Sequence, residues 1–393
     1  MKQFLSVPEA KAILDRETAA LPMEEIPLDE AVGRVAAVDV HAPLDMPSFD
    51  NSAMDGYALI WEPGRESYTL VGEIAAGDGR AQQLVQGQAM RIFTGAPVPL
   101  GADTVVQQEW SSKEGDQVHF EGNVKRGMHI RRRGTQCRQG ESILKAGTRI
   151  TPGAIALLSS VGINRIAVHR LPVVQVLVTG NEIAAPGTEL PPGAVYNTNG
   201  PFLGAYLKQS GFPVQVHGPV PDEPETLRKS IHDALLNCDV LILTGGISVG
   251  EYDFVQPMLL EAGAHPFFYK LKQKPGKPIW AGRVGNTIVF ALPGNPASVI
   301  TCANQYVMPV LKKMAGFQDV FEPDARLPLR QDYHKKAGLT QILKVQVAEG
   351  QVEVLGGQES FNLLPFAEAN ALAVVPEEDD WIKVGSLVPV YYL

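Results

Sequence analysis

Three apolar runs in the middle of the chain, VVQVLVTG, DVLILTGG and TIVFALPG, each end in a glycine-containing turn. Helix-like segments lie between or after these runs, at residues 200–210, 224–237, 253–262 and 296–315. Near-continuous apolar strands that alternate with helices are typical of a parallel sheet covered by helices on both faces. Residues 171–320 are therefore predicted to form a layered α/β domain.

The rest of the chain has a different texture. Ser6, with Glu9 three positions later, forms a capping-box pattern that predicts a helix over residues 6–20. Short β-rich runs such as SYTLVGEI follow, and Thr151-Pro152 then predicts another helix to about residue 160. We therefore predict a segmented N-terminal domain (1–45 and 137–170), an inserted β-rich domain (46–136) and a C-terminal β-barrel or sandwich (321–393).

Charge and cysteine content narrow the class of protein. A formal net charge of −9 and an isoelectric point of about 5.5 argue against nucleic acid or an anionic membrane as the main partner. Cys137, Cys238 and Cys302 are too widely spaced to suggest a disulfide framework or a thiolate zinc site. The first residues lack the apolar stretch of a signal peptide, and no apolar run approaches the roughly 18 residues of a membrane span. A cytoplasmic protein is expected.

The turns after the three apolar strands are candidates for a binding site. In open α/β sheets, ligands bind beyond the carboxyl ends of the strands, so these turns are expected to meet at one place. Glycine allows backbone N–H groups to approach an anion closely, and the start of a helix adds a favourable dipole. Each turn taken alone is also consistent with a plain connecting loop. The residues are Glu182 after the first strand, Gly245 and Gly246 after the second, and Pro293, Asn295 and Pro296 after the third.

The stretch Gly-Ile-Ser-Val-Gly around Ser248 also fits the nucleophile elbow of a serine hydrolase. Such an enzyme needs a histidine downstream, and the candidates are His265 and His334. Neither clearly follows a core strand. The alternative role for Ser248 is to donate its hydroxyl and N–H to a phosphate group.

Two basic clusters suggest a small polyanionic ligand. Lys270, Lys272 and Lys274 alternate, so in an extended strand they would share one face and repel one another unless an anion lay over them. A solvated edge strand protected by lysine is the alternative. Arg131 begins a second cluster, three consecutive arginines before a glycine, for which a solvated turn remains an equal alternative.

Carboxylates are the remaining candidates. Asp55, which precedes Gly56, is first of all predicted to lie in a hairpin turn. Phosphate-rich ligands are usually handled with Mg²⁺, which prefers one or two carboxylates plus ligand oxygens. We nominate Asp253, Glu182, Asp222 and Asp55 as the acids of such a site.

Taken together, the motifs SAMDGYA, IRRRG, TGNE, GGISVGEYD, KPGKP and LPGNPAS resemble the molybdopterin molybdenumtransferase family, which is similar to the E domain of gephyrin. The resemblance runs over nearly the whole chain, in the expected order. It implies an elongated four-domain homodimer with a molybdopterin-binding three-layer α/β domain and a C-terminal β-barrel. The implied reaction inserts molybdate into adenylylated molybdopterin, with Mg²⁺, and releases AMP. Molybdopterin adenylyltransferase and apo-molybdoenzymes are the implied transient partners.

The resemblance also assigns roles to individual residues. Asp253 matches the family's essential carboxylate, and with Glu182 it is expected to hold the metal ion. The other matches are Asp222 and Asp55 as site acids, Lys270, Lys274 and Arg131 as anion-binding residues, and Ser360 from the C-terminal domain. The glycines Gly245 and Gly246, with Ser248, Pro293, Asn295 and Pro296, are expected to bind substrate.

Three stretches depart from the family pattern. Neutral Gln136 stands where an acid is usual, and Leu339 stands in a Gly-Arg-Thr-Glu-Phe stretch that here reads Gly-Leu-Thr-Gln-Ile. The usual Ser-Ser pair reads Leu-Leu-Pro at residues 363–365. These changes leave open a divergent, non-catalytic molybdopterin-binding or scaffold protein. An active enzyme is the favoured reading, because the α/β-domain acids and lysines are retained.

Overall fold

The computed structural model describes residues 2–247 and 254–393. The chain forms two compact units, which are considered separately. The first comprises residues 1–24, 33–37 and 168–393, and the second comprises residues 25–32 and 38–167. In the described part of the chain, no helix is both long enough and apolar enough to cross a membrane.

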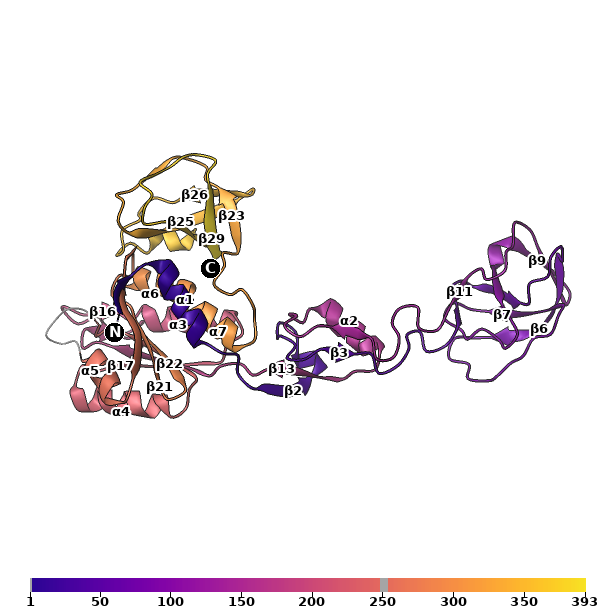
Figure 1. The fold of residues 1–393 in the computed structure, drawn as a ribbon, viewed down its shortest axis with the longest axis horizontal. Coiled ribbons are helices and arrows are strands. Elements are labelled where there is room, and N and C mark those ends of the chain that lie inside the picture. The colour runs from indigo at the N-terminus through magenta and orange to yellow at the C-terminus, as the bar shows by residue number, and fades with distance from the viewer. Residues whose placement is uncertain (1, 248–253) are drawn as a thin grey trace. The chain divides into compact units, whose positions relative to one another are not determined.

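A seven-stranded sheet forms the centre of the first unit (Figure 1). Its strands β22 (Thr287–Leu292), β18 (Val240–Thr244), β14 (Val174–Thr179) and β17 (Val214–Val220) are parallel, and the first three are the predicted apolar runs. In spatial order the strands are β1 (Lys2–Leu5), β19 (His265–Leu271), β21 (Trp280–Val284), β22 (Thr287–Leu292), β18 (Val240–Thr244), β14 (Val174–Thr179) and β17 (Val214–Val220).

Helices cover both faces of this sheet, because alternate strand residues point to opposite sides. Val176 and Val178 of β14 face one apolar core, whereas Leu177 between them faces the other. The second core is covered by α4 (Pro224–Leu235) and α5 (Val255–Glu261). The first is covered by α3 (Asn199–Gln209), α6 (Pro296–Cys302), the π-helical turn η3 (Ala303–Val307) and α7 (Met308–Met314). The predicted three-layer domain is confirmed.

One strand of the sheet runs against the predicted parallel direction. Strand β21 is antiparallel to both β19 and β22. The reason is local: Gly285-Asn286 joins β21 to β22 as a two-residue turn, with Gly285 at a φ of 57°. Such a turn can connect only antiparallel neighbours.

The first residues of the chain pack with the α/β sheet. Strand β1 pairs in parallel with β19, and α1 (Val7–Glu17) buries Ala10 and Leu14 in the first apolar core. The predicted capping box is present, since Ser6 accepts a hydrogen bond from the Glu9 backbone and Glu9 accepts one from Ser6. Residues 1–24 thus belong to the same compact unit as the α/β domain, although the sequence placed them with residues 137–170.

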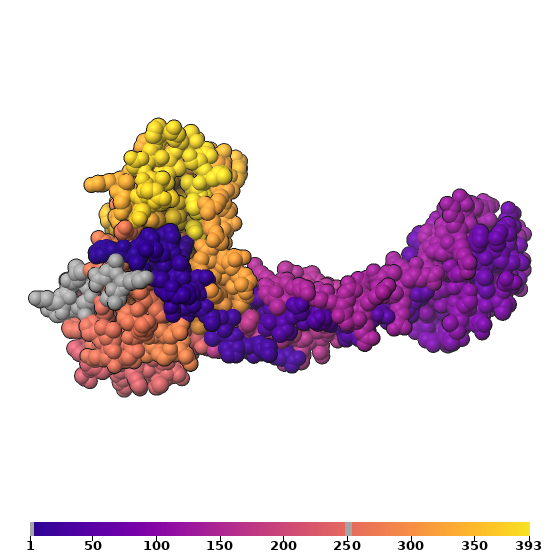
Figure 2. All heavy atoms as spheres, viewed as in Figure 1, coloured from indigo at the N-terminus to yellow at the C-terminus, as the bar shows by residue number. Residues whose placement is uncertain are grey.

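The C-terminal residues form a small β domain, which lies beside α1 (Figure 2). Arg330 donates its backbone N–H to Val352 O at 2.8 Å, and Leu329 bridges Val352, so the two ends of the sheet meet as the predicted barrel requires. The strands are β20 (Gln273–Lys274), β25 (Thr340–Ala348), β26 (Gln351–Val354), β27 (Ala371–Val375), β29 (Leu387–Tyr392) and β23 (Ala325–Pro328), with β24 (Tyr333–His334) paired to β28 (Trp381–Ile382) and the short helix η4 (Leu364–Ala367).

The second unit is rich in β-structure, as predicted for its inserted part. Its six-stranded sheet comprises β8 (Thr104–Gln107), β5 (Gly56–Leu59), β7 (Gln88–Ile92), β6 (Ser67–Ile74), β10 (Gln117–Phe120) and β9 (Ser111–Glu114). Helix α2 (Pro152–Ser160) begins at Thr151, whose hydroxyl accepts from the Ala154 N–H.

Two-stranded ribbons and short turns complete the chain: β2 (Met23–Pro27) with β13 (Arg165–His169), β3 (Val40–His41) with β12 (Ser142–Leu144), β4 (Asn51–Ser52) with β11 (Ile130–Arg131), β15 (Ile183–Ala184) with β16 (Val195–Tyr196), η1 (Leu28–Glu30) and η2 (Gln108–Trp110).

Candidate functional site

A cleft of about 570 Å³ lies beyond the carboxyl ends of β14, β18 and β22. It brings together residues from all three predicted turns, from the lysine-rich segment and from the C-terminal domain. The predicted site residues that line it are Glu182, Gly245, Gly246, Lys274, Pro293, Asn295 and Ser360. The sequence therefore predicted the location and much of the lining of this cleft.

The glycine turn after β18 brings the backbone close to β14. Gly245 has a φ of 96°, and a Cβ atom there would lie 2.7 Å from the Thr179 carbonyl oxygen. Gly246 has a φ of 63°, and its Cβ would lie 2.8 Å from Val255 Cγ2. A larger residue would therefore push this turn away from the strand and change the wall of the cleft.

Gly245→Ala should lower the free energy of unfolding more than Gly263→Ala does. Both glycines have a positive φ, but nothing lies within 4 Å of a Cβ built at Gly263. Gly263→Ala measures the cost of backbone strain alone, about 1–2 kcal/mol. In Gly245→Ala, the contact with Thr179 should add a similar amount to that cost. Urea denaturation of both variants checks this, and equal losses would contradict the contact.

The third turn starts a helix directly at the cleft. Asn295 accepts a hydrogen bond from the Ala297 N–H at 3.2 Å and so caps the start of α6, with Pro296 in its first turn. The carbonyl of Gly294 accepts from the Asn199 amide at 2.9 Å, which fixes the turn against α3. Ser298, one turn into the helix, also lines the cleft.

In the lysine-rich segment, half-buried or exposed lysines alternate with buried residues as predicted, but the three lysines have different surroundings. Lys270 has a φ of 62°, which interrupts the extended strand, and its ammonium group lies 4.7 Å from the Tyr269 ring centre. Lys272 lies 3.8 Å from Glu377 in an ion pair. Lys274 lines the cleft, as does Lys277 beyond the Pro-Gly turn. The lysines meet different partners because the chain leaves β19 after Leu271 and joins the C-terminal sheet through β20.

Two of the nominated carboxylates lie near each other. Burial, and then the charge of Glu182, raises the pKa of Asp222 above its usual value. The Asp222 backbone N–H also donates to Asn181 Oδ1 at 3.0 Å, which ties the two turns together. Asp253 and Ser248 lie outside the described residues.

This pair of carboxylates is compatible with a hard cation. In residues 2–247 and 254–393, no group of three or more histidine, cysteine or acidic side chains is arranged to hold a metal ion. Mg²⁺, however, typically takes only one or two carboxylates and completes its shell with water and phosphate oxygens. The negative charge of Glu182 disfavours ionisation of Asp222, and a bound cation would offset this repulsion. The pair is therefore suited to such an ion.

The C-terminal domain contributes Ser360 on a loop that a buried lysine holds. Lys344, which is 2% exposed, donates to the carbonyls of Gly357 at 2.8 Å, Glu359 at 3.1 Å and Asn362 at 2.7 Å. Burial lowers the pKa of Lys344. Leu339 lines the same cleft, so one departure from the family pattern replaces an expected arginine on its wall.

Asp55 lies in the second unit, and the hairpin predicted there is wrong. Strand β4 pairs with β11, whereas β5 pairs with β7 and β8, so residues 53–55 connect two different sheets. A Cβ on Gly56 would lie 2.0 Å from Val106 O, so this close strand contact explains the glycine. The Thr94 hydroxyl and N–H donate to Asp55 Oδ1 at 2.7 Å each and lower its pKa.

Of the three consecutive arginines, two have acidic partners in the second unit. Arg132 donates to Asp50 and Arg133 to Asp45, each at 2.6 Å. Arg131 is exposed on β11, and within the described part of the chain it forms no ion pair. This arrangement leaves Arg131 as the member of the cluster available to an external anion.

The two histidines required by the hydrolase hypothesis lie away from the cleft wall. His265 begins β19, at the amino end of a strand parallel to β22, whereas the cleft lies at the carboxyl ends. His334 stacks on Trp381 in the C-terminal domain, with ring centres 5.3 Å apart. Neither histidine lines the cleft, so no observation favours that hypothesis.

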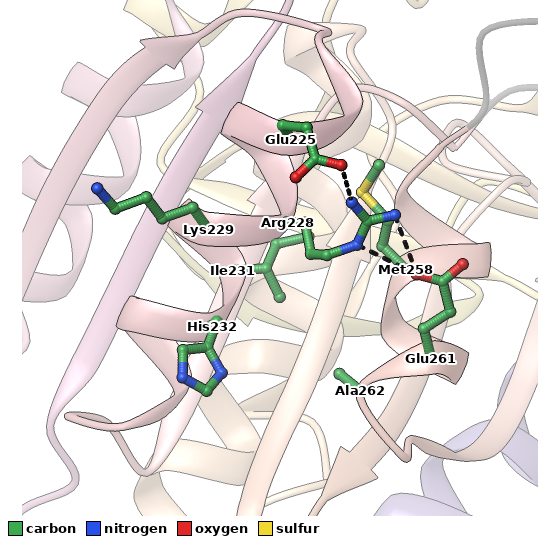
Figure 3. Close-up of a pocket in the computed structure, with 8 residues that line it drawn as sticks. All are labelled: Glu225, Arg228, Lys229, Ile231, His232, Met258, Glu261 and Ala262. Carbon is green, nitrogen blue, oxygen red and sulfur yellow. Dashed lines mark hydrogen bonds and ion pairs between the residues drawn. The ribbon is translucent and has the colours of Figure 1, made fainter.

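Other hollows in the first unit lack the predicted residues. Between α4 and α5, a pocket of about 400 Å³ contains Arg228, but Glu225 at 2.7 Å and Glu261 at 3.3 Å already bind its guanidinium group (Figure 3). A groove of about 690 Å³ lies between α1 and the C-terminal sheet and contains Lys11. The Lys11 ammonium group donates to Gln305 Oε1 and to the Tyr391 hydroxyl, each at 2.9 Å.

The stability of the protein should depend on pH through Lys11. Burial lowers the pKa of Lys11 from 10.5 to about 8, with Glu322 opposing the shift. Between pH 8 and pH 10.5, Lys11 is protonated in the unfolded chain but largely neutral in the folded protein. The free energy of unfolding, compared with that of Lys11→Met, should therefore rise with pH over this range, by about 3 kcal/mol at most. Burial raises the pKa of Tyr391 to about 12, so Tyr391 stays neutral in this window. Urea denaturation of both proteins from pH 7 to pH 10.5 tests this, and parallel pH profiles would contradict it.

Several residues at the cleft were not singled out from the sequence. Gln273 lines it, and Lys344 holds the loop of Ser360 through hydrogen bonds to backbone carbonyls of that loop. No local pattern marks a glutamine between lysines or a lysine inside a β-strand as part of a site. Their role depends on contacts between segments far apart in the sequence.

Comparisons with known proteins agree with this architecture. Three families match in order: the MoeA N-terminal region (domain I and II) over residues 5–162, a probable molybdopterin binding domain over 175–313, and the MoeA C-terminal region (domain IV) over 326–393. The chain is 34% identical to a molybdopterin molybdenumtransferase of Nostoc, over 94% of this chain and 88% of the relative. It is 32% identical to molybdopterin molybdenumtransferase 2 of Mycobacterium tuberculosis, over 99% of each chain.

A solved structure gives the same result for the fold. The crystal structure of the molybdopterin biosynthesis moeA protein from Pyrococcus horikoshii superposes with a TM-score of 0.85 at 28% identity, covering 99% of this chain and all of the other. The fold and cleft thus define a multidomain protein with a molybdopterin-binding type of α/β domain. Within that class, the chain belongs to the molybdopterin molybdenumtransferase family.

Proposed function

We propose that the protein inserts molybdate into adenylylated molybdopterin, releases AMP and so yields the molybdenum cofactor. The observation that carries the proposal is the cleft itself, where Lys274 and Lys277 lie with Glu182 and with the glycine turn at Gly245. Both substrates are anions, and the relatives named above are molybdopterin molybdenumtransferases. A site of this kind needs cationic and N–H donors for the oxyanions and acids for a metal ion.

The residues of the cleft divide the work by charge. Lys274 and Lys277 attract molybdate and the phosphate groups, while the glycine turn allows the anion to approach the backbone closely. Glu182 and Asp222, with Asp253, are the acids that would hold Mg²⁺. Mg²⁺, when bound, offsets the charge that develops as the phosphoanhydride to AMP is broken. Without a cation these acids would repel the substrate.

Asp55 and Arg131, which belong to the second unit, are proposed as functional residues on the basis of the family resemblance. Arg131 lacks an ion-pair partner among the described residues, which supports a role in binding an anion. A homodimer is proposed from the same resemblance. A cytoplasmic location is proposed as well, and the three cysteines, which are free thiols, support it. Transient contact with molybdopterin adenylyltransferase and with apo-molybdoenzymes would bring the substrate and take the product.

A non-catalytic molybdopterin-binding protein is the second candidate, and one observation favours it. Leu339 lines the cleft where the family pattern has arginine, so the cleft has lost a positive charge. Lys274 and Lys277 on the same cleft favour catalysis instead, because they retain the anion-attracting charge.

Reconstitution of an apo-molybdoenzyme distinguishes these candidates. The protein is incubated with adenylylated molybdopterin, Mg²⁺ and limiting molybdate, and the mixture is then offered to the apo-enzyme. Activity should appear only when all components are present, and EDTA should abolish it. Equal activity with and without the protein would contradict the proposed function.

A further inference from the structure

A buried glutamine, bound in turn by a buried tyrosine, contacts the turn that joins the two lysines of the cleft. Gln273 is 1% exposed and Tyr306 is fully buried. The Gln273 amide nitrogen donates to the carbonyls of Pro275 at 3.1 Å and Gly276 at 3.0 Å. Its amide oxygen accepts from the Tyr306 hydroxyl. The amide nitrogen of Gln273 is therefore bonded to the turn at residues 275–276, and its amide oxygen is bonded to Tyr306.

The turn that these bonds hold is tightly packed. Gly276 has a φ of 84°, and a Cβ atom there would lie 2.6 Å from Cys302 Sγ and 2.8 Å from Gln273 Nε2. Cys302 ends α6, and its Sγ also lies 3.6 Å from the Gln273 amide nitrogen. The turn therefore rests on the helix whose first residues form another wall of the cleft.

Tyr306 reaches Gln273 from an irregular part of that helix. It belongs to the π-helical turn η3, where Asn304, Gln305 and Tyr306 are all buried. Gln305 accepts from Lys11, and Asn304 donates to the Tyr206 hydroxyl at 3.1 Å and to the Tyr392 carbonyl at 2.8 Å. Such single π turns are frequent at functional sites. Here the turn directs three polar side chains to three different neighbours.

We propose that Gln273 and Tyr306 are positioning residues, which hold the turn at residues 274–277 so that Lys274 and Lys277 face the anionic substrate. Neither residue needs to touch the substrate. The inference rests on the proposed function for its kinetic consequence, whereas the consequence for the geometry of the turn is independent of activity. Loss of the Tyr306 hydroxyl leaves the Gln273 oxygen buried without its partner, and the carboxamide is then free to turn away.

Two tyrosine variants separate positioning from stability. Tyr306→Phe removes the hydrogen bond to Gln273, and Tyr206→Phe removes a buried hydrogen bond to Asn304 in the same apolar core. Both should lower Tm by similar amounts. Only Tyr306→Phe should raise the KM for molybdate, by about 10-fold, with kcat within about 2-fold of the parent protein. An equal KM effect in both variants, or none in Tyr306→Phe, would overturn the proposal.

Hydrogen exchange gives a second readout that needs no activity. Amides of residues 272–279 should exchange about 10-fold faster in Tyr306→Phe than in the parent or in Tyr206→Phe. Unchanged exchange would overturn the positioning role even in an active enzyme. Faster exchange in a protein without molybdate-dependent activity would support the role and reject the proposed function. If Tyr306→Phe does not fold, Cys302→Ala tests the neighbouring contact of Gln273 and the Gly276 turn with Cys302 Sγ, and it should raise the KM for molybdate by about 3-fold. A parental KM in this variant would overturn the proposal.

Discussion

Glu182→Gln is expected to reduce the turnover of adenylylated molybdopterin by roughly 10²- to 10³-fold. The substitution keeps the shape of the side chain and removes the negative charge with which Glu182, on the cleft wall, would hold the proposed metal ion. Because Glu182 is exposed, the free energy of unfolding should change by less than about 0.5 kcal/mol. AMP release under saturating substrates measures the effect, and thermal unfolding verifies that the fold is intact.

Glu225→Gln is the matched control for this variant. Glu225 is also an exposed acid of the α/β domain, but it binds Arg228 in the pocket between α4 and α5 (Figure 3). Its replacement should leave AMP release unchanged. Similar rates for Glu182→Gln and the parent protein would remove Glu182 from the catalytic acids.

Lys274→Met should raise the KM for molybdate by about 10- to 100-fold, because one charge-assisted contact to the oxyanion is lost. Lys274 lines the cleft, and within the described residues it has no acidic partner at ion-pair distance. Its charge is therefore available to a ligand. A molybdate concentration series at saturating adenylylated molybdopterin gives the KM.

Lys272→Met controls for the loss of a positive charge in the same segment. Lys272 lies two residues away but pairs with Glu377, outside the cleft lining. We expect a KM close to that of the parent. If both variants raise the KM equally, the lysines act through general charge and the solvated-edge interpretation of this segment is favoured.

The sequence was sufficient to predict the sheet and to predict which turns meet at the cleft. Apolar runs over β14, β18 and β22 can be buried only in a covered sheet, and the glycine turns after them follow from the same pattern. The direction of β21 was missed, because a short apolar run does not reveal its partner strand. A two-residue Gly-Asn turn at residues 285–286 was the available signal.

The lysine segment shows why side-chain geometry could not be predicted. Lysines and buried residues alternate from Lys270 to Lys274, but this pattern could not show which of the lysines lines the cleft and which pairs with an acid. The part played by Gln273 depends on Tyr306, which is 33 positions away in the sequence. Contacts of this kind follow from the packing of whole elements, and no local pattern encodes them.

The most direct test of the account is AMP release from adenylylated molybdopterin with Mg²⁺, in the presence and absence of molybdate. We predict release that requires molybdate and saturates with it. Binding of the pterin without AMP release under either condition would contradict the proposed function and identify a non-catalytic molybdopterin-binding protein. Release at the same rate without molybdate would contradict it as well, since the protein would then be a hydrolase of the anhydride.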